Sequence, residues 1–152
     1  MYDKTRSSFA GIIGYLNTSF ANMSTEIGFV VIMPSFQRTH VTSNAVGLLM
    51  RYALELPGNG GMGMRRLVWH ATTVNPKSVR TAKRMGFQQE GILRWHMMLR
   101  CEDAKGGNGK PLRKGDPRAS FVGRDTVLLS VCWDDWEAGV RKLVEETMAR
   151  ER

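Results

Sequence analysis

Two junctions between a strand pattern and a helix pattern carry residue types that could do chemistry. At the first, the apolar run of residues 26–33 leads through residues 37–42 (QRTHVT) into a helical pattern. The first N–H groups of a helix have no partner inside the helix, and the helix dipole adds partial positive charge there. Because Arg38 contributes a full charge, we predict a pyrophosphate site at this junction. The alternative is a solvated turn with Thr42 or Ser43 as its helix cap.

The second junction comprises residues 75–78 (NPKS), directly after the strand pattern of residues 65–73. Asparagine is a favoured N-cap, and proline is favoured at the first helical position. Asn75 and Pro76 therefore predict the start of a helix, and N-capping by itself is sufficient to explain them. Gly86 is predicted to end this helix, since glycine readily adopts the left-handed conformation of a C-cap.

Few other side chains suggest chemistry. His70 and His96 each lie in a strand pattern, where a histidine more often makes a structural hydrogen bond than catalyses a reaction. The two cysteines, Cys101 and Cys132, are too few for a disulfide framework or a four-ligand zinc site. We predict free thiols in the reducing cytoplasm and no metal ion.

Periodicity predicts the elements that position these residues. Strand patterns and helix patterns alternate in the order β-β-α-β-α-β-β-α, with a hairpin at each end. This order predicts a mixed α/β sheet with at least one parallel crossover. The predicted strands are 11–20, 26–33, 65–73, 93–99 and 126–133, and the predicted helices are 42–55, 75–86 and the segment from 134 onward.

Composition favours one domain. The chain has 152 residues, of which 42% are hydrophobic and 24% charged, enough to bury a core. Extended disorder and a membrane-spanning helix are excluded, since aromatic residues are plentiful and no apolar run approaches the ~20 residues that a bilayer requires. The first residues show no apolar signal segment, so we expect no export. A net charge of +8 favours anionic partners without choosing among them.

Residues 102–123 contain several glycines and prolines, and we predict a flexible loop insertion there. A basic cluster lies in and beside this segment: Lys105, Lys110, Arg113, Lys114, Arg118 and Arg124. A solvated loop is the simpler interpretation. A basic nucleic-acid-binding module is an alternative, although no aromatic residue interleaves with these charges before Phe121.

Several short strings in the sequence together resemble one known family. They are EIGFVVIMP (26–34), QRTHVT (37–42), RRLVW (65–69), NPKS (75–78), MGF (85–87), EGILR (90–94), GRDTVLLS (123–130) and DDW (134–136). Their order and spacing resemble the GNAT (acyl-CoA N-acyltransferase) superfamily, in particular the branch that includes the ribosomal-protein N-terminal acetyltransferases. The resemblance covers most of the chain, from about residue 11 to residue 136.

The resemblance implies a mixed, partly splayed central β-sheet flanked by helices. The family pattern begins with a strand and two helices that have no counterpart here. We therefore expect residues 1–152 to form a single, N-terminally truncated domain with a C-terminal helix over 134–150. The implied donor is acetyl-CoA, and the implied acceptor is a primary amine on a protein N-terminus or a small molecule. The expected cofactor-binding residues are Val31, Ile32, Met33, Gln37, Arg38, Thr39, His40, Val41, Thr42, Ser43, Asn75 and Ser78.

The resemblance also implies direct attack of a neutral amine on the thioester in a ternary complex. Glu26 stands where several family members have a catalytic glutamate, so we predict it as the base, with burial raising its pKa; an ion-paired strand end is the alternative. A backbone N–H near residues 31–33 is the predicted oxyanion donor. Ser78 is the predicted proton donor to the sulfur, and a helix-turn hydroxyl without that role is the alternative.

Three positions depart from the family pattern. His40 and Thr42 stand where many members have smaller residues against the pyrophosphate, and Ala82 stands where a tyrosine often acts as the acid. A CoA-binding or protein-interaction domain without turnover is therefore the first alternative function. A second copy of the chain is expected to cover the exposed N-terminal side as a homodimer. Neither a membrane nor a nucleic acid is expected as a partner.

Overall fold

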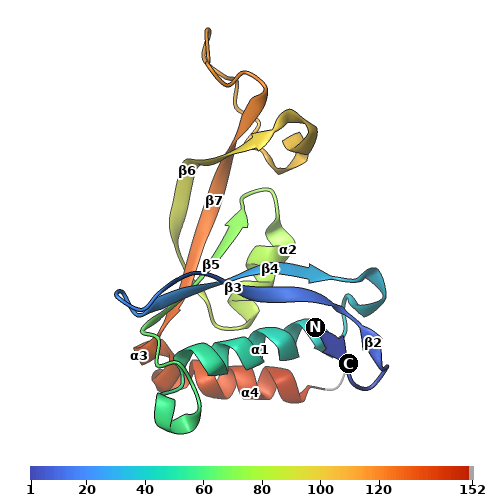
Figure 1. Cartoon of the computed structure of the whole chain (residues 1–152), viewed down its shortest axis with the longest axis vertical. Helices are drawn as coiled ribbons and strands as arrows, with labels where there is room; N and C mark the ends of the chain where they lie inside the picture. Colours follow the sequence, from blue (N-terminus) through green and yellow to red (C-terminus); the bar gives the residue numbers. More distant parts are fainter. Residues whose placement is uncertain (151–152) are drawn as a thin grey trace.

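The computed structural model describes residues 1–150, and its centre is a mixed five-stranded sheet (Figure 1). The strands are β3 (Gly11–Ser19), β4 (Ser24–Ile32), β5 (Arg66–Thr72), β6 (Gln88–Arg100) and β7 (Phe121–Cys132). Their order in the sheet is β3-β4-β5-β7-β6; β4 and β5 run parallel and the other neighbours antiparallel. A short hairpin of β1 (Tyr2–Asp3) and β2 (Ser8–Phe9) precedes them. The predicted mixed α/β sheet with a parallel crossover is confirmed.

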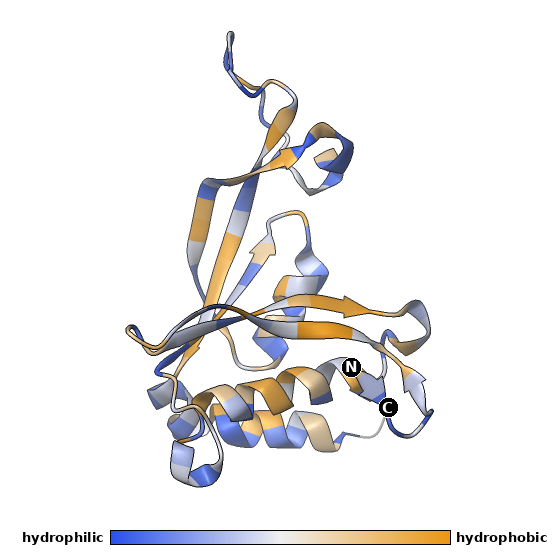
Figure 2. Cartoon of the chain, viewed as in Figure 1, coloured by the Kyte–Doolittle hydropathy of each residue, from blue (hydrophilic) through white to orange (hydrophobic). Residues whose placement is uncertain are grey.

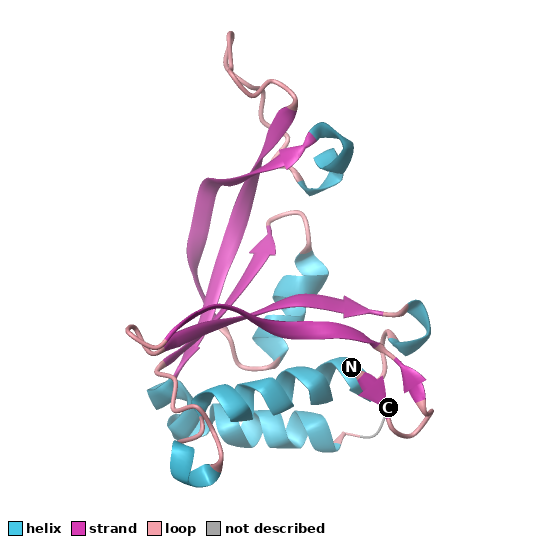
Figure 3. Cartoon of the chain, in the orientation of Figure 1, coloured by secondary structure: helices cyan, strands magenta, loops and turns pink. Residues whose placement is uncertain are grey.

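The helices follow in the predicted order (Figure 3). They are α1 (His40–Leu54), α2 (Pro76–Arg84), α3 (Trp133–Asp135) and α4 (Arg141–Ala149), with the short 3-10 helices η1 (Pro34–Phe36), η2 (Pro57–Asn59) and η3 (Cys101–Gly106). A π-helical segment, η4 (Trp136–Val140), separates α3 from α4. The helix predicted over 134–150 is interrupted because Gly139, with φ of +154°, leaves the helical conformation. Within residues 1–150, no helix combines the length and apolar character needed to cross a bilayer.

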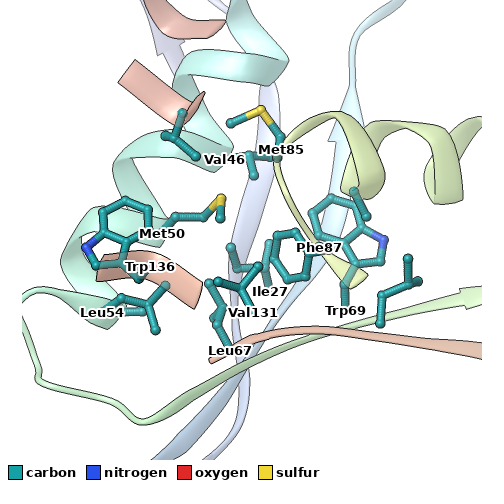
Figure 4. Close-up of a cluster of buried hydrophobic side chains, with 14 of the residues drawn as sticks. Ile27, Val46, Met50, Leu54, Leu67, Trp69, Met85, Phe87, Val131 and Trp136 are labelled. Atoms are coloured by element: carbon teal, nitrogen blue, oxygen red, sulfur yellow. The ribbon is translucent and has the colours of Figure 1, made fainter. Parts of the chain in front are cut away.

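One face of the sheet packs against the helices and forms the core. In Figure 4, Ile27, Leu67 and Val131 of three neighbouring strands lie against Met50 of α1 and Trp136 of η4. Figure 2 shows apolar residues concentrated along the central strands and along α1. Successive side chains of a strand point to opposite faces of the sheet. The residues between these core positions therefore lie on the other face, away from α1 and α4.

Strands β6 and β7 are longer than the sequence predicts. Their patterns covered residues 93–99 and 126–133, whereas the strands begin at Gln88 and Phe121. β6 is an edge strand, and almost all of its residues are exposed or half-buried. No alternation of apolar and polar residues therefore marks its ends, because neither side needs to be apolar.

The segment between β6 and β7 is attached to the sheet at its base. Thr72 Oγ1 donates a hydrogen bond of 2.8 Å to the carbonyl oxygen of Gly106. Asn108 Nδ2 and Lys110 Nζ donate to the carboxylate of Asp125 at 2.9 and 2.7 Å. These bonds hold the pKa of Asp125 well below its usual value. The flexibility predicted for this segment stays a prediction.

At the start of β5, Arg66 forms a two-pronged ion pair with Glu90 of β6. Arg66 Nη1 and the Ser130 hydroxyl each donate to Glu90 Oε1 at 2.7 Å. These hydrogen bonds outweigh burial and lower the pKa of Glu90 from 4.5 to about 2. A carboxyl group with a depressed folded-state pKa stabilises the fold above its unfolded pKa, and this stabilisation is lost as the pH falls through the folded pKa.

We expect Glu90→Gln to remove part of the acid sensitivity of the fold. The melting temperature of the wild type should exceed that of the variant above pH 4.5, and the difference should shrink as the pH falls toward about 2. Thermal melts of both proteins at a series of pH values measure this. A difference that stays constant across that range would show that the Arg66 pair does not shift the titration of Glu90.

Candidate active site

The parallel pair β4–β5 is joined only at its beginning. Its pairing runs from Ser24 and Arg66 to Glu26 and Val68 and ends there, although both strands continue. Beyond this point the strands diverge (Figure 1). Backbone N–H and C=O groups on diverging strands are free to pair with an extended ligand that carries amides of its own. The partly splayed sheet implied by the family resemblance is confirmed.

A groove of about 510 Å³ lies beside this opening. Its walls come from the end of β4, the loop before α1, the first turn of α1, β5 and the length of α2. The lining residues are Val30, Ile32, Gln37, Arg38, Thr39, Thr42, Trp69, Asn75, Lys77, Ser78, Thr81 and Arg84. The two junctions singled out in the sequence, more than thirty residues apart in the chain, thus form opposite walls of one groove.

Part of the predicted cofactor-binding set lines the groove and part does not. Ile32, Gln37, Arg38, Thr39, Thr42, Asn75 and Ser78 are lining residues, whereas Val31, Met33, His40, Val41 and Ser43 are not. Val41 and Ser43 are buried in α1, and Val31 follows Val30 on a strand, so its side chain points to the opposite face. Trp69 was not predicted as a lining residue, because its position depends on how β5 packs against α2.

The N-terminus of α1 is capped by Thr39. The Thr39 hydroxyl accepts a hydrogen bond from the N–H of Val41 at 3.4 Å and donates to the carbonyl oxygen of Phe36 at 2.7 Å. The alternative interpretation of this junction put the cap at Thr42 or Ser43, which was wrong: α1 begins at His40, before the apolar periodicity that marks the helix in the sequence. Thr39 therefore fixes the first N–H groups of α1 at the mouth of the groove.

His40 does not obstruct the groove. Its imidazole Nε2 lies 3.7 Å from Asp3 Oδ1 in the N-terminal hairpin. Asp3 is almost fully buried, and His40 is not a lining residue. The bulk that distinguishes His40 from the smaller residue of the family pattern is thus directed away from the place where a phosphate would approach.

Asn75 and Ser78 form the start of α2 as predicted. The Asn75 side chain accepts a hydrogen bond from the N–H of Ser78 at 3.1 Å, and Pro76 occupies the first helical position. The Ser78 hydroxyl accepts a hydrogen bond of 3.0 Å from Trp69 Nε1. Because this bond uses a lone pair of the oxygen, the hydroxyl hydrogen stays available for donation into the groove.

A β-bulge interrupts β4 next to the groove. Ile12 pairs with Val31 and Gly14 with Gly28, so one residue of β3 faces two residues of β4. Phe29, at the bulge, has a φ of +51°. Bulges leave a backbone group without its ladder partner and are frequent beside active sites. The sequence carries no signal for this bulge, since a phenylalanine is not expected at positive φ.

The bulge lies just before residues 31–33, the segment predicted to supply the oxyanion donor. The N–H of Met33, part of the predicted 31–33 segment, already donates to the carbonyl oxygen of Ala10 at 2.9 Å. It is therefore not available to a ligand, and this part of the prediction is wrong. The residues of the bulge, Phe29 and Val30, are closer to the end of the β4–β5 pairing.

Glu26 is the last residue of β4 that pairs with β5, and its side chain is buried. Oε2 accepts hydrogen bonds from Asn17 Nδ2 at 2.9 Å and lies 3.0 Å from His70 Nδ1. Burial alone would raise the pKa of Glu26, as predicted, but the hydrogen bonds from His70 and Asn17 outweigh it and lower the pKa below its usual value. The expectation of a raised pKa was wrong because the sequence did not reveal these two donors.

The groove is cationic. Arg38, Lys77 and Arg84 line it together with the N-terminus of α1, and no aspartate or glutamate of the described residues is among its lining residues. Guanidinium and ammonium groups beside a helix N-terminus are suited to a ligand with several phosphate groups.

A second cluster of polar side chains serves the fold. Cys132, Asp134 and Asp135 hold potential metal-ligand atoms within 4.8 Å of one another at the start of α3. Both oxygens of the Asp135 carboxylate are already engaged, by the N–H of Cys132 at 2.9 Å and by Gln88 Nε2 at 2.7 Å. The cluster acts as a helix cap that ties α3 to β6.

A splayed parallel strand pair, with a cationic groove and a capped helix N-terminus at its open end, defines an acyl-CoA N-acyltransferase fold. A family model described as an acetyltransferase (GNAT) domain matches residues 2–88, more than half of the chain. The chain belongs to this family.

Solved structures show the same relationship over a larger part of the chain. A GCN5-related N-acetyltransferase from Brucella melitensis is 27% identical, with a TM-score of 0.75 over 97% of this chain and 55% of its own. A probable GNAT-family acetyltransferase from Chromobacterium violaceum is 29% identical, with a TM-score of 0.66 over 88% of this chain and 54% of its own.

A more distant structure shares the fold alone. A chimera of the spermidine N-acetyltransferase SpeG from Vibrio cholerae and hSSAT is 14% identical, with a TM-score of 0.65 over 91% of this chain and 69% of its own. No curated protein matches the chain. The chain spans about half the length of the Brucella melitensis and Chromobacterium violaceum proteins.

Proposed function

We propose that the protein is an acetyl-CoA-dependent N-acetyltransferase that transfers an acetyl group to a primary amine, on a protein N-terminus or a small molecule. The observation that carries this proposal is the end of β4–β5 pairing at Glu26 and Val68, directly beside the cationic groove. Membership of the GNAT family supports the same reaction class.

The lining residues fit acetyl-CoA as the cosubstrate. The pyrophosphate would lie on the first N–H groups of α1, next to Arg38, where helix dipole and side-chain charge act together. The amides of the pantetheine arm would pair with the backbone at the end of β4, between Val30 and Ile32. Asn75 and Ser78 would border the same arm from α2.

The residues at the end of the strand pairing fit the needs of amine acylation. The amine must lose a proton to attack, and the Glu26–His70 pair is the proposed acceptor of that proton. The bulge at Phe29 and Val30 is the proposed source of an N–H for the oxyanion. The Ser78 hydroxyl, held by Trp69, is the proposed donor to the leaving sulfur.

The positions of the thiols support direct transfer in a ternary complex. Cys101 is exposed at the far end of β6 and Cys132 lies at the end of β7. Neither lines the groove, so an acyl-cysteine intermediate has no suitably placed nucleophile among the described residues.

The test is CoA thiol release from acetyl-CoA in the presence of a panel of amines: peptides with free N-termini, a polyamine and small primary amines. We expect release that depends on one class of amine. Stabilisation by acetyl-CoA without release would instead support the CoA-binding alternative. No response to acetyl-CoA, combined with steeply salt-dependent binding to unrelated nucleic acids, would support the nucleic-acid-binding alternative. Homodimer formation and a cytoplasmic location stay predictions.

A further inference from the structure

Three titratable side chains from three different strands meet on the sheet face opposite the core. His70 of β5 lies between Glu26 of β4 and His96 of β6: its Nδ1 is 3.0 Å from Glu26 Oε2, and the two imidazole rings have centroids 5.5 Å apart. His96 Nδ1 lies 3.2 Å from Thr126 Oγ1. The cluster adjoins the point where β4 and β5 separate.

No local sequence pattern connects these residues. A register shift between Leu93 and Met97 places three residues of β6 opposite the single residue Asp125 of β7. The Asp125 carboxylate accepts the N–H of Trp95 at 2.8 Å, and Trp95 has a φ of +52°. Such a bulge changes the direction of side chains along a strand, and here it accompanies the approach of His96 to His70.

We propose that His70 is the residue that takes the proton from the acceptor amine, through Nε2, and that Glu26 is a positioning residue that orients His70. This proposal rests on the proposed acetyltransferase function and assigns the base within its Glu26–His70 pair.

The tautomer of His70 supports this assignment. An ionised carboxylate only accepts hydrogen bonds, so a Glu26 oxygen 3.0 Å from Nδ1 favours the tautomer with its hydrogen on Nδ1. In the neutral imidazole, Nε2 then carries the lone pair. A carboxylate that fixes the tautomer and orientation of a histidine is an effective way to prepare a base. The side chain of His70 is 23% exposed, so part of the imidazole is open to solvent.

Glu26 is less suited to accept the proton itself. Its Oε2 already accepts hydrogen bonds from both Asn17 and His70. These donors favour the ionised form and lower the pKa of Glu26, which weakens it as a base near neutral pH. The groups that face His70 are Glu26, His96 and, through these two, Asn17 and Thr126.

The proposed step balances in protons and bonds. An acceptor ammonium gives one proton to Nε2 of His70, and the freed nitrogen lone pair forms a bond to the thioester carbonyl carbon. The C–S bond breaks, and the second nitrogen proton accompanies the departing sulfur by way of the Ser78 hydroxyl to give the CoA thiol and the amide. His70 then releases its proton to solvent.

The experiment compares the pH dependence of thiol release for the wild type, His70→Gln, Glu26→Gln and His96→Gln in the full chain. We expect His70→Gln to lower kcat at least about 100-fold and to remove the ascending limb of the pH profile. Glu26→Gln should lower kcat less and keep the limb, because His70 is still present to accept the proton. His96→Gln, the matched control, should keep the limb and most of the turnover.

Two further readouts separate a base from a structural residue. The acetyl-CoA dissociation constant of His70→Gln should stay within about twofold of the wild type, since His70 does not line the groove. With an acceptor amine that is already neutral at the assay pH, the decrease of kcat in His70→Gln relative to the wild type should be smaller. In nitrogen NMR of the resting protein, His70 should carry its hydrogen on Nδ1.

The opposite pattern would overturn the proposal. If Glu26→Gln removes the limb while His70→Gln keeps it, Glu26 is the base. A hydrogen on Nε2 of neutral His70 would exclude Nε2 as the acceptor. A wild type that binds acetyl-CoA but releases no thiol with any amine would instead refute the proposed function, and with it the role of His70.

Discussion

Replacing Arg38 with alanine is expected to weaken CoA binding by about 10- to 100-fold, because hydrogen bonds to charged groups contribute about 1.5–3 kcal/mol. Arg38 lines the groove directly before the capped start of α1. A pantetheine fragment without phosphates should bind the variant and the wild type equally. Calorimetric titration of both ligands measures the difference.

Arg80→Ala is the matched control for this prediction. Arg80 is exposed on α2 near Lys77 and Ser78 but does not line the groove. Both variants remove one positive charge, so a general electrostatic attraction would weaken CoA binding equally in the two. Equal losses for CoA and for pantetheine in Arg38→Ala would exclude a phosphate contact by Arg38.

Trp136→Ala is expected to destabilise the fold by about 3–5 kcal/mol, the usual cost of removing a buried tryptophan. The Trp136 side chain is 1% exposed and lies at the centre of the helix-covered core. Its Nε1 also donates to Glu55 Oε1 at 3.1 Å, at the end of α1. The loss is a large share of the roughly 5–15 kcal/mol that stabilises a typical domain.

Chemical denaturation measures this effect, and Trp133→Ala is its control. Trp133, three residues earlier, is 50% exposed, so its removal should change the free energy of unfolding by only about 0.5 kcal/mol. A similar loss in both variants would show that the C-terminal helices do not pack on the core in the way Figure 4 shows.

Local patterns in the sequence were sufficient for the elements that form the groove. The N-cap and proline at Asn75 and Pro76 predicted the start of α2, and Gly86, with φ of +92°, follows its C-cap as expected. The period of apolar residues predicted α1 to within two residues of each end. These signals are short-range, because caps and periodicity depend on neighbours along the chain.

The arrangement around Glu26 could not be predicted in the same way. Its contact with His70 depends on the register of β4 against β5, and the approach of His96 depends on a bulge in an exposed edge strand. Neither is encoded in a local pattern. Both histidines were interpreted as structural because each was considered alone in its own strand.

The same limit explains why only part of the predicted cofactor-binding residues line the groove. A run such as residues 37–42 identifies a helix start that can bind phosphate, but not which of its side chains face the ligand. His40 and Val41 belong to that run, and packing against the N-terminal hairpin and the core turns them away. Trp69, which does line the groove, lies in a strand that carries no ligand-binding pattern.

The proposed function requires acetyl-CoA to bind in the groove where β4 and β5 separate. Hydrogen–deuterium exchange of the full chain, with and without saturating acetyl-CoA, measures where it binds. We predict slower exchange at the end of β4, at the start of α1 and at the start of α2. The parts of β6 and β7 that extend past the other strands should change little. No change at these three places, or protection confined to the segment between β6 and β7, would contradict the claim.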